Sequence, residues 1–496
     1  MNTPHVARQT ATSSLLMLGV SSIEVPLQLG TLAIVARLLE PRDFGLMAMA
    51  MAVAVLFESF WSFGFPTAVV QSEQLGASQV RQMMRYNLRI VTKLSLGLAL
   101  SSPLIAAAFR EPVLMYVLPV VALAVSTTSS TGVHLGLLRR EMMFGSIAIG
   151  RLVANLLASI SSIALAYAGA GVWALVGQHA VLRLVLSASR LVFWRLQGSV
   201  LAPDAGDIEG MLRVARDLRL TRVVEALGER LDALLTGLFV GASPLGFYSN
   251  ARRWAEIPML QVVQPSQGPV VSGLSRIRGE AGKASAEDSE SAYRSVVGAA
   301  FSAVGSLLAP MYGLLALEAP RIVEIVLGPQ WLESAPLLRL LAAGFFADAL
   351  IRLLTSPALA EGRSNVLARW SIVRTLSRTL GVCCGLPWGV AGVACGYAAA
   401  NALLFVPGLR FLLQGSAVQL GDVCTPLLRP LVAVAGAFTV TLLATNALSS
   451  RPSILILLSS AVCFASAYAL LWLALPGGRA RFAEGVALLR QETSEM

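Results

Sequence analysis

The chain has 496 residues, of which 56% are hydrophobic and only 13% charged, with a mean hydropathy of +0.70. Soluble domains contain about 25% charged residues, so this composition excludes a set of ordinary soluble domains and indicates a membrane protein. The formal net charge is +10, but 36 of the 38 basic residues are arginines scattered along the chain, which argues against nucleic acid as a partner.

Apolar stretches of about 20 residues, enough to cross a bilayer core as helix, follow one another from the N-terminus. Their continuous rather than alternating hydrophobicity favours helices over a β-barrel. We predict an all-α polytopic membrane protein with 14 spans, over residues 12–36, 46–70, 91–109, 113–136, 147–168, 172–194, 217–240, 250–273, 294–317, 335–359, 365–386, 389–413, 429–448 and 453–475. The first apolar stretch is too long for a cleavable signal and is interpreted as the first span.

Basic residues in the short connections predict the orientation of the chain. With the N-terminus inside, 25 of the 38 lysines and arginines fall in inner segments and 7 in outer segments. The sequence therefore predicts that both termini are cytoplasmic.

The first six spans and the next six resemble one another in order. One motif ends in Gly45 after the first span, and its counterpart ends in Gly246 after the seventh, 201 residues later. An even number of spans in each half gives parallel repeats, as in some secondary transporters. The predicted parts are an N-terminal lobe over 1–195, a cytoplasmic linker over 196–216, a C-terminal lobe over 217–414, two extra helices over 415–476 and a cytoplasmic tail over 477–496.

Polar side chains inside spans are costly and usually face a cavity or a partner. They gather in spans one, two, seven and eight, the first two helices of each repeat, where a substrate path between repeats would run. These residues are Glu24, Gln28, Glu58, Arg222, Glu225, Glu229, Arg230, Asp232, Arg253, Glu256, Gln261 and Gln264. The charges of span seven follow one helix face, which fits either a polar cavity wall or an ion-pair ladder between two helices.

Further charges lie in spans ten and eleven. Asp348 and Arg352 are spaced i,i+4, and Arg374 and Arg378 form a basic face. We interpret them as local pairs or as side chains that snorkel to the inner surface.

Motifs for catalysis are missing from the sequence. It has no G-x-x-x-x-G-K-[ST] phosphate loop, no G-x-S-x-G and no H-E-x-x-H. The five cysteines have no C-x-x-C spacing, which argues against a metal site or a disulfide framework. We predict that the protein is not an enzyme and has no catalytic residues, metal or cofactor.

The chain contains, in order, A-R-L-L-E-P-R-D-F-G-L over 36–46, L-L-R-R-E-M-M-F over 137–144, G-V-W-A-L-V over 171–176, R-L-D-A-L-L-T-G over 230–237 and L-G-F-Y-S-N-A over 245–251. Together these segments resemble the Wzx-type polysaccharide and O-antigen flippases of the multidrug/oligosaccharidyl-lipid/polysaccharide (MOP, MATE-like) superfamily. The resemblance is closest to the colanic-acid exporters.

The resemblance implies two six-helix lobes in a V shape, with two extra C-terminal helices. It implies a bacterial inner-membrane flippase that moves undecaprenyl-diphosphate-linked oligosaccharide to the periplasmic leaflet by alternating access, for exopolysaccharide, capsule or O-antigen (lipopolysaccharide) assembly. The implied partners are the lipid-linked oligosaccharide, membrane lipid, and polysaccharide polymerase and chain-length proteins.

Basic cavity residues of the superfamily are thought to meet the diphosphate. By position in the spans, this selects Arg37, Arg222, Arg230 and Arg253, with Gln28, Gln261 and Gln264 lining the same cavity. The family's Asn-Arg-x-Asp segment reads Glu-Arg-Leu-Asp over 229–232 here, which adds negative charge. The candidates for coupling to a proton or sodium ion are Glu24, Glu58, Glu225, Glu229, Asp232 and Glu256.

Three alternatives remain open on the sequence. A cation-coupled drug antiporter of the same superfamily would need an anionic cavity. A membrane-embedded glycan polymerase or ligase would need a sizeable outer loop, and the predicted connections are short. The third alternative is an assembly scaffold that transports nothing.

Overall fold

The computed structural model describes residues 3–61, 65–72, 75–197, 226–280, 286–446 and 453–476. Within these ranges every regular element is a helix, which confirms the predicted all-α class. The chain divides into two compact units, Met1–Ser249 and Asn250–Met496. Arg222, Glu225, most of the predicted linker and the predicted tail lie outside the described residues.

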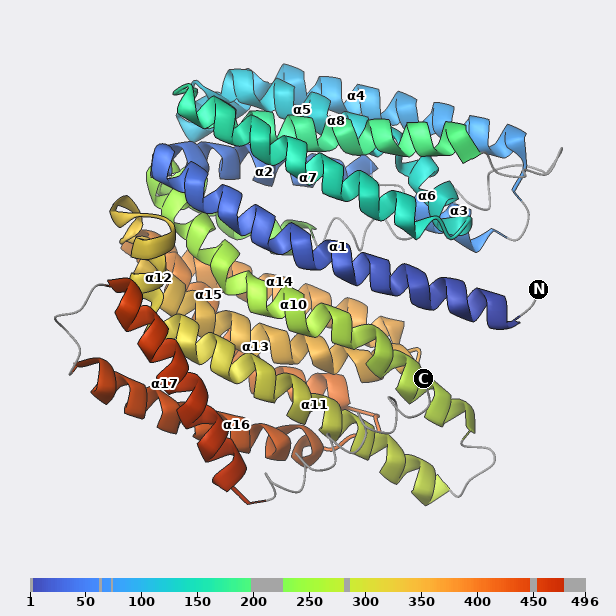
Figure 1. Ribbon diagram of the computed structural model, residues 1–496. Coiled ribbons are helices and arrows are strands. Elements are labelled where there is room, and N and C mark those ends of the chain that lie inside the picture. The colour runs from blue at the N-terminus through green and yellow to red at the C-terminus, as the bar shows by residue number, and fades with distance from the viewer. Residues whose placement is uncertain are drawn as a thin grey trace. The chain divides into compact units, whose positions relative to one another are not determined.

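The first unit is built from helices drawn in blue to green in Figure 1. They are α1 (Thr3–Leu38), α2 (Pro41–Trp61), α3 (Phe65–Gln71), α4 (Ala77–Phe109), α5 (Leu114–Ser130), α6 (Gly132–Arg140), α7 (Phe144–Tyr167), α8 (Val172–Gln197), a helix over 226–239, and the first turns of α10 (Ala242–Glu280). Helix α7 packs against α1 and α8, and α5 packs against α2, α4 and α8.

The second unit contains the rest of α10 and the following helices, drawn in yellow-green to red in Figure 1. These are α11 (Ala286–Leu317), α12 (Ala319–Val326), α13 (Ser334–Ala360), α14 (Ser364–Gly385), α15 (Gly389–Leu413), α16 (Leu420–Asn446) and α17 (Ser453–Ala474), with the short 3₁₀ turns η1 (Pro329–Trp331) and η2 (Leu386–Trp388). Helix α15 packs against α13 and α14, and α16 packs against α11 and α17.

The helices follow the predicted spans but differ from them at the ends. Helix α4 begins at Ala77, whereas the span was predicted from residue 91. Its first turns contain Arg81, Arg85 and Arg89, so hydropathy detects only the part that lipid would cover. The fourth span consists of two helices, α5 and α6, separated at Thr131.

Eight stretches of the described helices are long and apolar enough to cross a membrane. One of them, 364–413, includes both α14 and α15. The protein is therefore a multi-span membrane protein, and the count of 14 spans stays a prediction.

The two glycines of the repeated motif make a close contact between two helices of the first unit. Gly45 of α2 lies against the start of α10, and Gly246 of α10 lies against the start of α2. A Cβ atom on Gly45 would be 1.8 Å from the carbonyl oxygen of Ala242, and one on Gly246 would be 1.8 Å from that of Pro41. The offset of 201 residues that relates Gly45 to Gly246 also relates Pro41 to Ala242. The contact is therefore reciprocal, which supports the proposed equivalence of the two motifs and explains why each position requires glycine.

Another part of the resemblance has a structural role at the start of α8. The Asp43 carboxylate accepts a hydrogen bond from the backbone N–H of Val172, the first residue of α8. It also accepts one from the N–H of Glu40 at 3.2 Å. Burial raises the pKa of Asp43, and these hydrogen bonds oppose the rise. A carboxylate at this place satisfies an amide that the helix itself leaves unpaired.

Candidate functional site

A polar cluster joins α1 to α7 in the first unit. Glu24 is 3% exposed and forms an ion pair with Arg151. The Asn155 amide donates to Glu24 Oε1 at 3.2 Å, and Gln28 donates to Asn155 Oδ1 at 3.1 Å. Two predicted site residues, Glu24 and Gln28, are thus brought together in one network.

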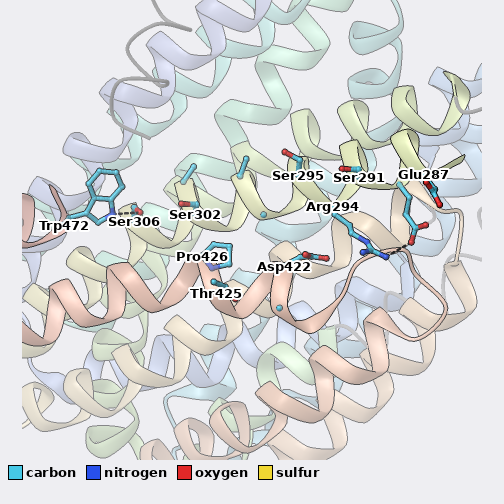
Figure 2. A pocket seen from close by; sticks show the side chains of 15 residues that line it. Glu287, Ser291, Arg294, Ser295, Ser302, Ser306, Asp422, Thr425, Pro426 and Trp472 are labelled. Atoms are coloured by element: carbon cyan, nitrogen blue, oxygen red, sulfur yellow. Dashed lines mark hydrogen bonds and ion pairs between the residues drawn. The ribbon is translucent and has the colours of Figure 1, made fainter. Parts of the chain in front are cut away.

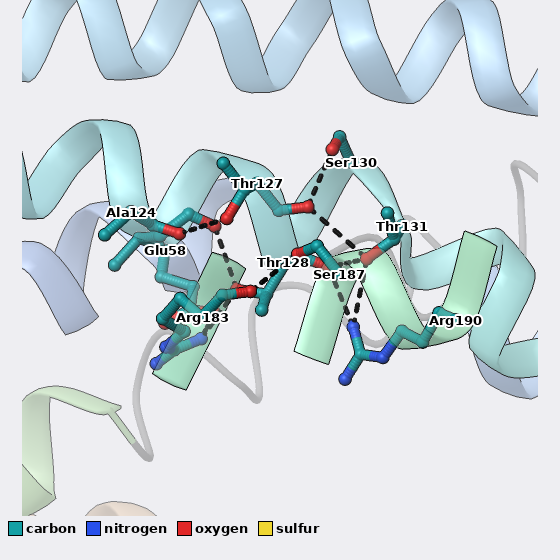
Figure 3. A network of polar contacts seen from close by, with 10 residues as sticks. Glu58, Ala124, Thr127, Thr128, Ser130, Thr131, Arg183, Ser187 and Arg190 are labelled. Atoms are coloured by element: carbon teal, nitrogen blue, oxygen red, sulfur yellow. Dashed lines mark hydrogen bonds and ion pairs between the residues drawn. The ribbon is translucent and has the colours of Figure 1, made fainter. Parts of the chain in front are cut away.

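A second cluster joins α2, α5 and α8 (Figure 3). Arg183 donates to the Thr128 hydroxyl at 2.9 Å and lies 3.4 Å from the carboxylate of Glu58. About two turns further along α8, Arg190 donates to the carbonyl of Thr128 at 3.0 Å and to the hydroxyl of Thr131 at 3.2 Å. The cluster has two guanidinium groups and one carboxylate, and it includes the predicted residue Glu58.

Asp232 has a partner from the start of α10. The Tyr248 hydroxyl donates to Asp232 Oδ2 at 2.6 Å, and both residues are buried. On the same helix Glu229 is exposed, while Arg230 is partly buried. The predicted charged face of span seven is therefore divided between a buried hydrogen bond at Asp232 and more accessible residues nearer the start of the helix.

The largest group of charges is in the second unit, between α13 and α14. Asp348 is fully buried and accepts a hydrogen bond from Arg352 Nε at 3.1 Å. From α14, Arg378 forms an ion pair with Asp348, and Arg374 lies 3.6 Å from it. The expected pair of Asp348 and Arg352 is present. The arginines of α14, which were expected to pair locally or snorkel, instead share this carboxylate.

Helix α15 contributes an aromatic ring and an amide group that contact the arginines of its neighbours. Arg378 donates twice to Asn401 Oδ1, at 2.9 and 2.7 Å, and its guanidinium lies 5.3 Å from the centre of the Tyr397 ring. Arg252 of α10 lies over the same ring at 5.5 Å and over Phe345 at 5.8 Å. We call Asp348, Arg252, Arg352, Arg374 and Arg378 the arginine cluster.

Within the arginine cluster, Arg352, Arg374 and Arg378 share the one carboxylate of Asp348. The side chains of Arg352 and Arg374 are 26% and 16% exposed, so an anion can reach them. Guanidinium groups bind phosphate oxygens in pairs of parallel hydrogen bonds, and phosphate is the ligand chemistry that this arrangement fits.

The other predicted site residues are found at more accessible places. Arg37, Arg253, Gln261 and Gln264 are exposed, and Glu256 is partly buried. The residues predicted for the site did not include three groups that form polar clusters: Arg183, Arg190 and the arginines of α14. A usable signal was present: Arg374 and Arg378 repel each other at i,i+4, and α14 contains no acidic residue, so their counter-charge had to come from another helix.

A groove of about 1160 Å³ runs between α11, α16 and α17 (Figure 2). Serines of α11 line its length, ending at Ser306, which accepts a hydrogen bond from Trp472 at 3.1 Å. Arg294 and Glu290 form a 2.6 Å ion pair at the opposite end, near Asp422.

Comparison with known proteins identifies the family. A model of the family described as polysaccharide biosynthesis protein matches residues 34–336, more than half of the chain. The chain belongs to this family.

Two relatives of this family member agree with the resemblance. The succinoglycan biosynthesis transport protein ExoT of Rhizobium meliloti is 26% identical over 364 residues, which cover 72% of this chain and 70% of ExoT. The lipopolysaccharide biosynthesis protein WzxC of Escherichia coli is 20% identical over 374 residues, covering 74% and 72%. The resemblance to Wzx-type flippases is therefore confirmed.

Two solved structures have a fold similar to that of this protein. The lipid II flippase MurJ, in an inward closed conformation, matches with a TM-score of 0.71 at 14% identity, covering 91% of this chain and 98% of MurJ. An inward-facing MATE family multidrug transporter of the MOP superfamily matches with a TM-score of 0.61 at 14% identity, covering 81% and 99%. The protein thus has the fold of this superfamily of transporters and lipid flippases.

Proposed function

We propose that this protein is a flippase that moves an undecaprenyl-diphosphate-linked oligosaccharide from the cytoplasmic to the periplasmic leaflet of the bacterial inner membrane. Family membership supports a role in polysaccharide biosynthesis. The observation that most directly supports an anionic substrate is the group of three arginines that share the one buried carboxylate of Asp348. The process needs no catalytic group, and the substrate is released unchanged.

The free-energy cost of moving a charged substrate through hydrocarbon explains why a flippase needs arginine and other polar side chains along the path. A diphosphate and its sugars would lose several kcal/mol for each polar group left unsatisfied in hydrocarbon. Guanidinium groups replace water around the phosphates, while the polyprenyl tail stays in lipid. Among the residues chosen from the sequence, Arg37, Arg230 and Arg253 remain proposed diphosphate contacts, with Gln28, Gln261 and Gln264 lining the cavity. To these we add Arg352 and Arg374, which are accessible members of the arginine cluster.

The function is tested by reconstitution. The purified protein is placed in liposomes with a fluorescent undecaprenyl-diphosphate oligosaccharide, and a membrane-impermeant quencher reports which leaflet contains the label. We expect movement of the label between leaflets that depends on the protein. Folded protein that moves a small organic cation but not the oligosaccharide lipid would favour a drug antiporter. Folded protein that moves neither would favour a polymerase, a ligase or a scaffold.

Neutralising Arg374 is expected to slow transport without loss of folding. The Arg374→Gln change removes one of several like charges around Asp348, so the helices keep their counter-ion while the substrate loses a charge-assisted contact. We expect the initial rate in the liposome assay to fall by about tenfold, the effect of one such contact. Arg369→Gln, at an exposed position of the same helix, is the matched control and should transport normally. Equal rates for the two variants would contradict the assignment.

We also propose that carboxylates couple transport to a proton or sodium ion, since release requires a change of affinity between two states. Glu58 is the candidate with the best test, because its side chain is 26% exposed and its arginine partner is 3.4 Å away. Glu58→Gln should reduce the dependence of the transport rate on pH or on sodium. Glu40→Gln, at an exposed position of the same unit, should not. An unchanged dependence on both ions in Glu58→Gln would remove Glu58 from the proposal.

A further inference from the structure

A small pocket in the first unit lies between α6, α7 and α8, next to the polar clusters of Glu24 and Glu58. Its volume is about 340 Å³. Each of the three helices contributes one arginine to it, Arg139 from α6, Arg151 from α7 and Arg190 from α8. Two hydroxyl groups, of Ser146 and Ser189, also line it.

No carboxylate is among the described residues that line this pocket. Arg151 has an ion pair with Glu24 through Nη2, and Arg190 uses only Nη1 for its two hydrogen bonds. Glu58, whose charge acts on Arg190, is itself paired with Arg183. In the described part of the chain the Arg139 side chain forms no hydrogen bond or ion pair. Guanidinium N–H groups therefore remain available for an anion.

The position of the pocket along the helices indicates the depth of its ligand. Arg139 lies in the last turn of α6, Ser146 in the first turn of α7, and Arg190 about two turns before the end of α8. These are the ends of segments long and apolar enough to span a membrane. Charged lipid headgroups lie at the level where spans end.

The size and chemistry of the pocket select the kind of ligand. Pockets for small molecules range from about 300 to 1,000 Å³, so this one admits a phosphate ester headgroup but not an oligosaccharide. Arginines bind phosphate oxygens bidentately, and serine hydroxyls can donate to them. The remaining lining side chains are apolar, including Phe144 and Phe193, and suit a ligand that is also in contact with hydrocarbon.

We infer that Arg139, Arg151 and Arg190 form a binding site for the phosphate group of an anionic membrane lipid, separate from the transported substrate. A lipid bound there connects the ends of three helices that otherwise repel one another through their arginines. It binds the folded unit and not the unfolded chain, so it raises the stability of the fold.

The test uses the full-length protein purified in a neutral detergent. Its melting temperature is measured during titration with mixed micelles containing either phosphatidylglycerol or phosphatidylcholine with the same acyl chains. Phosphatidylglycerol should raise the melting temperature, and phosphatidylcholine should not. In a third arm, inorganic phosphate replaces the lipid. Protection by inorganic phosphate alone would overturn the assignment to a lipid.

Variants identify the site. Arg139→Gln changes an exposed side chain and should leave folding intact, while the concentration of phosphatidylglycerol that gives half of the stabilisation rises by about tenfold. Arg190→Gln should act in the same direction. Arg195→Gln, further along α8 at an exposed position, is the matched control and should bind as the unchanged protein does. Native mass spectrometry provides a second readout, because retained phosphatidylglycerol should be depleted only in the pocket variants. Equal binding by Arg139→Gln and Arg195→Gln would overturn the proposal.

Discussion

Replacing Asp348 with asparagine is expected to destabilise the second unit by about 3–5 kcal/mol, the usual cost of removing one partner from a buried ion pair. The carboxylate is fully buried and is the shared counter-ion of Arg352, Arg374 and Arg378. Without it the three guanidinium groups keep their mutual repulsion and lose their attraction. The Asp348→Asn protein should give a lower yield of monodisperse protein and a lower melting temperature in detergent.

Two comparisons separate this effect from a general sensitivity to charge. Glu290→Gln removes the carboxylate of an exposed i,i+4 pair with Arg294 and should change stability by no more than about 0.5 kcal/mol. The double variant Asp348→Asn with Arg378→Gln removes one of the unpaired cations and should recover part of the loss. A double variant that is no more stable than Asp348→Asn alone would show that repulsion between the arginines is not the cause.

Gly246→Ala is expected to have the other large effect. The added methyl carbon would lie 1.8 Å from the carbonyl oxygen of Pro41, a backbone atom that cannot turn aside, so α2 and α10 would have to separate. Overpacking of this kind costs about 1–3 kcal/mol or more. The yield of folded protein should fall severalfold, and Gly45→Ala should do the same because the contact is reciprocal.

Helix α10 provides a matched control. A Cβ atom on Gly268 would meet no atom within 4 Å, so Gly268→Ala should be neutral or should stabilise the helix by up to about 1 kcal/mol. The melting temperatures of the two alanine variants are expected to differ for this reason. Similar values for Gly246→Ala and Gly268→Ala would mean that the close contact between the repeated motifs is not needed for stability.

Much of the fold could be predicted because lipid imposes simple rules on sequence. Every backbone amide in hydrocarbon must be paired within its segment, so long apolar runs predict helices without knowledge of their neighbours. The ends of the helices were harder to place. Helix α4 continues through its arginine-rich first turns because a helix in water needs no apolar residues, and hydropathy is insensitive to that part.

The repeat could also be found from the sequence. The reason why positions 45 and 246 require glycine could not. The offset between Gly45 and Gly246 is visible in the printed chain. That each glycine lies against the backbone preceding the other is a fact of packing. The same holds for Asp43, a residue of the family resemblance whose partner, the amide of Val172, is far away in sequence.

For the polar residues too, the sequence gives the positions along the chain and the tertiary structure gives the partners. The sequence by itself determined that the protein spans a membrane as helices and that it belongs with polysaccharide flippases, and it predicted that Glu24, Glu58 and Asp232 lie within spans. Only the tertiary structure decided that each of these has a partner on another helix, and that arginines from α13 and α14 share one carboxylate. Helical periodicity relates residues within one segment, whereas the electrostatic cost of a buried charge depends on every segment packed around it.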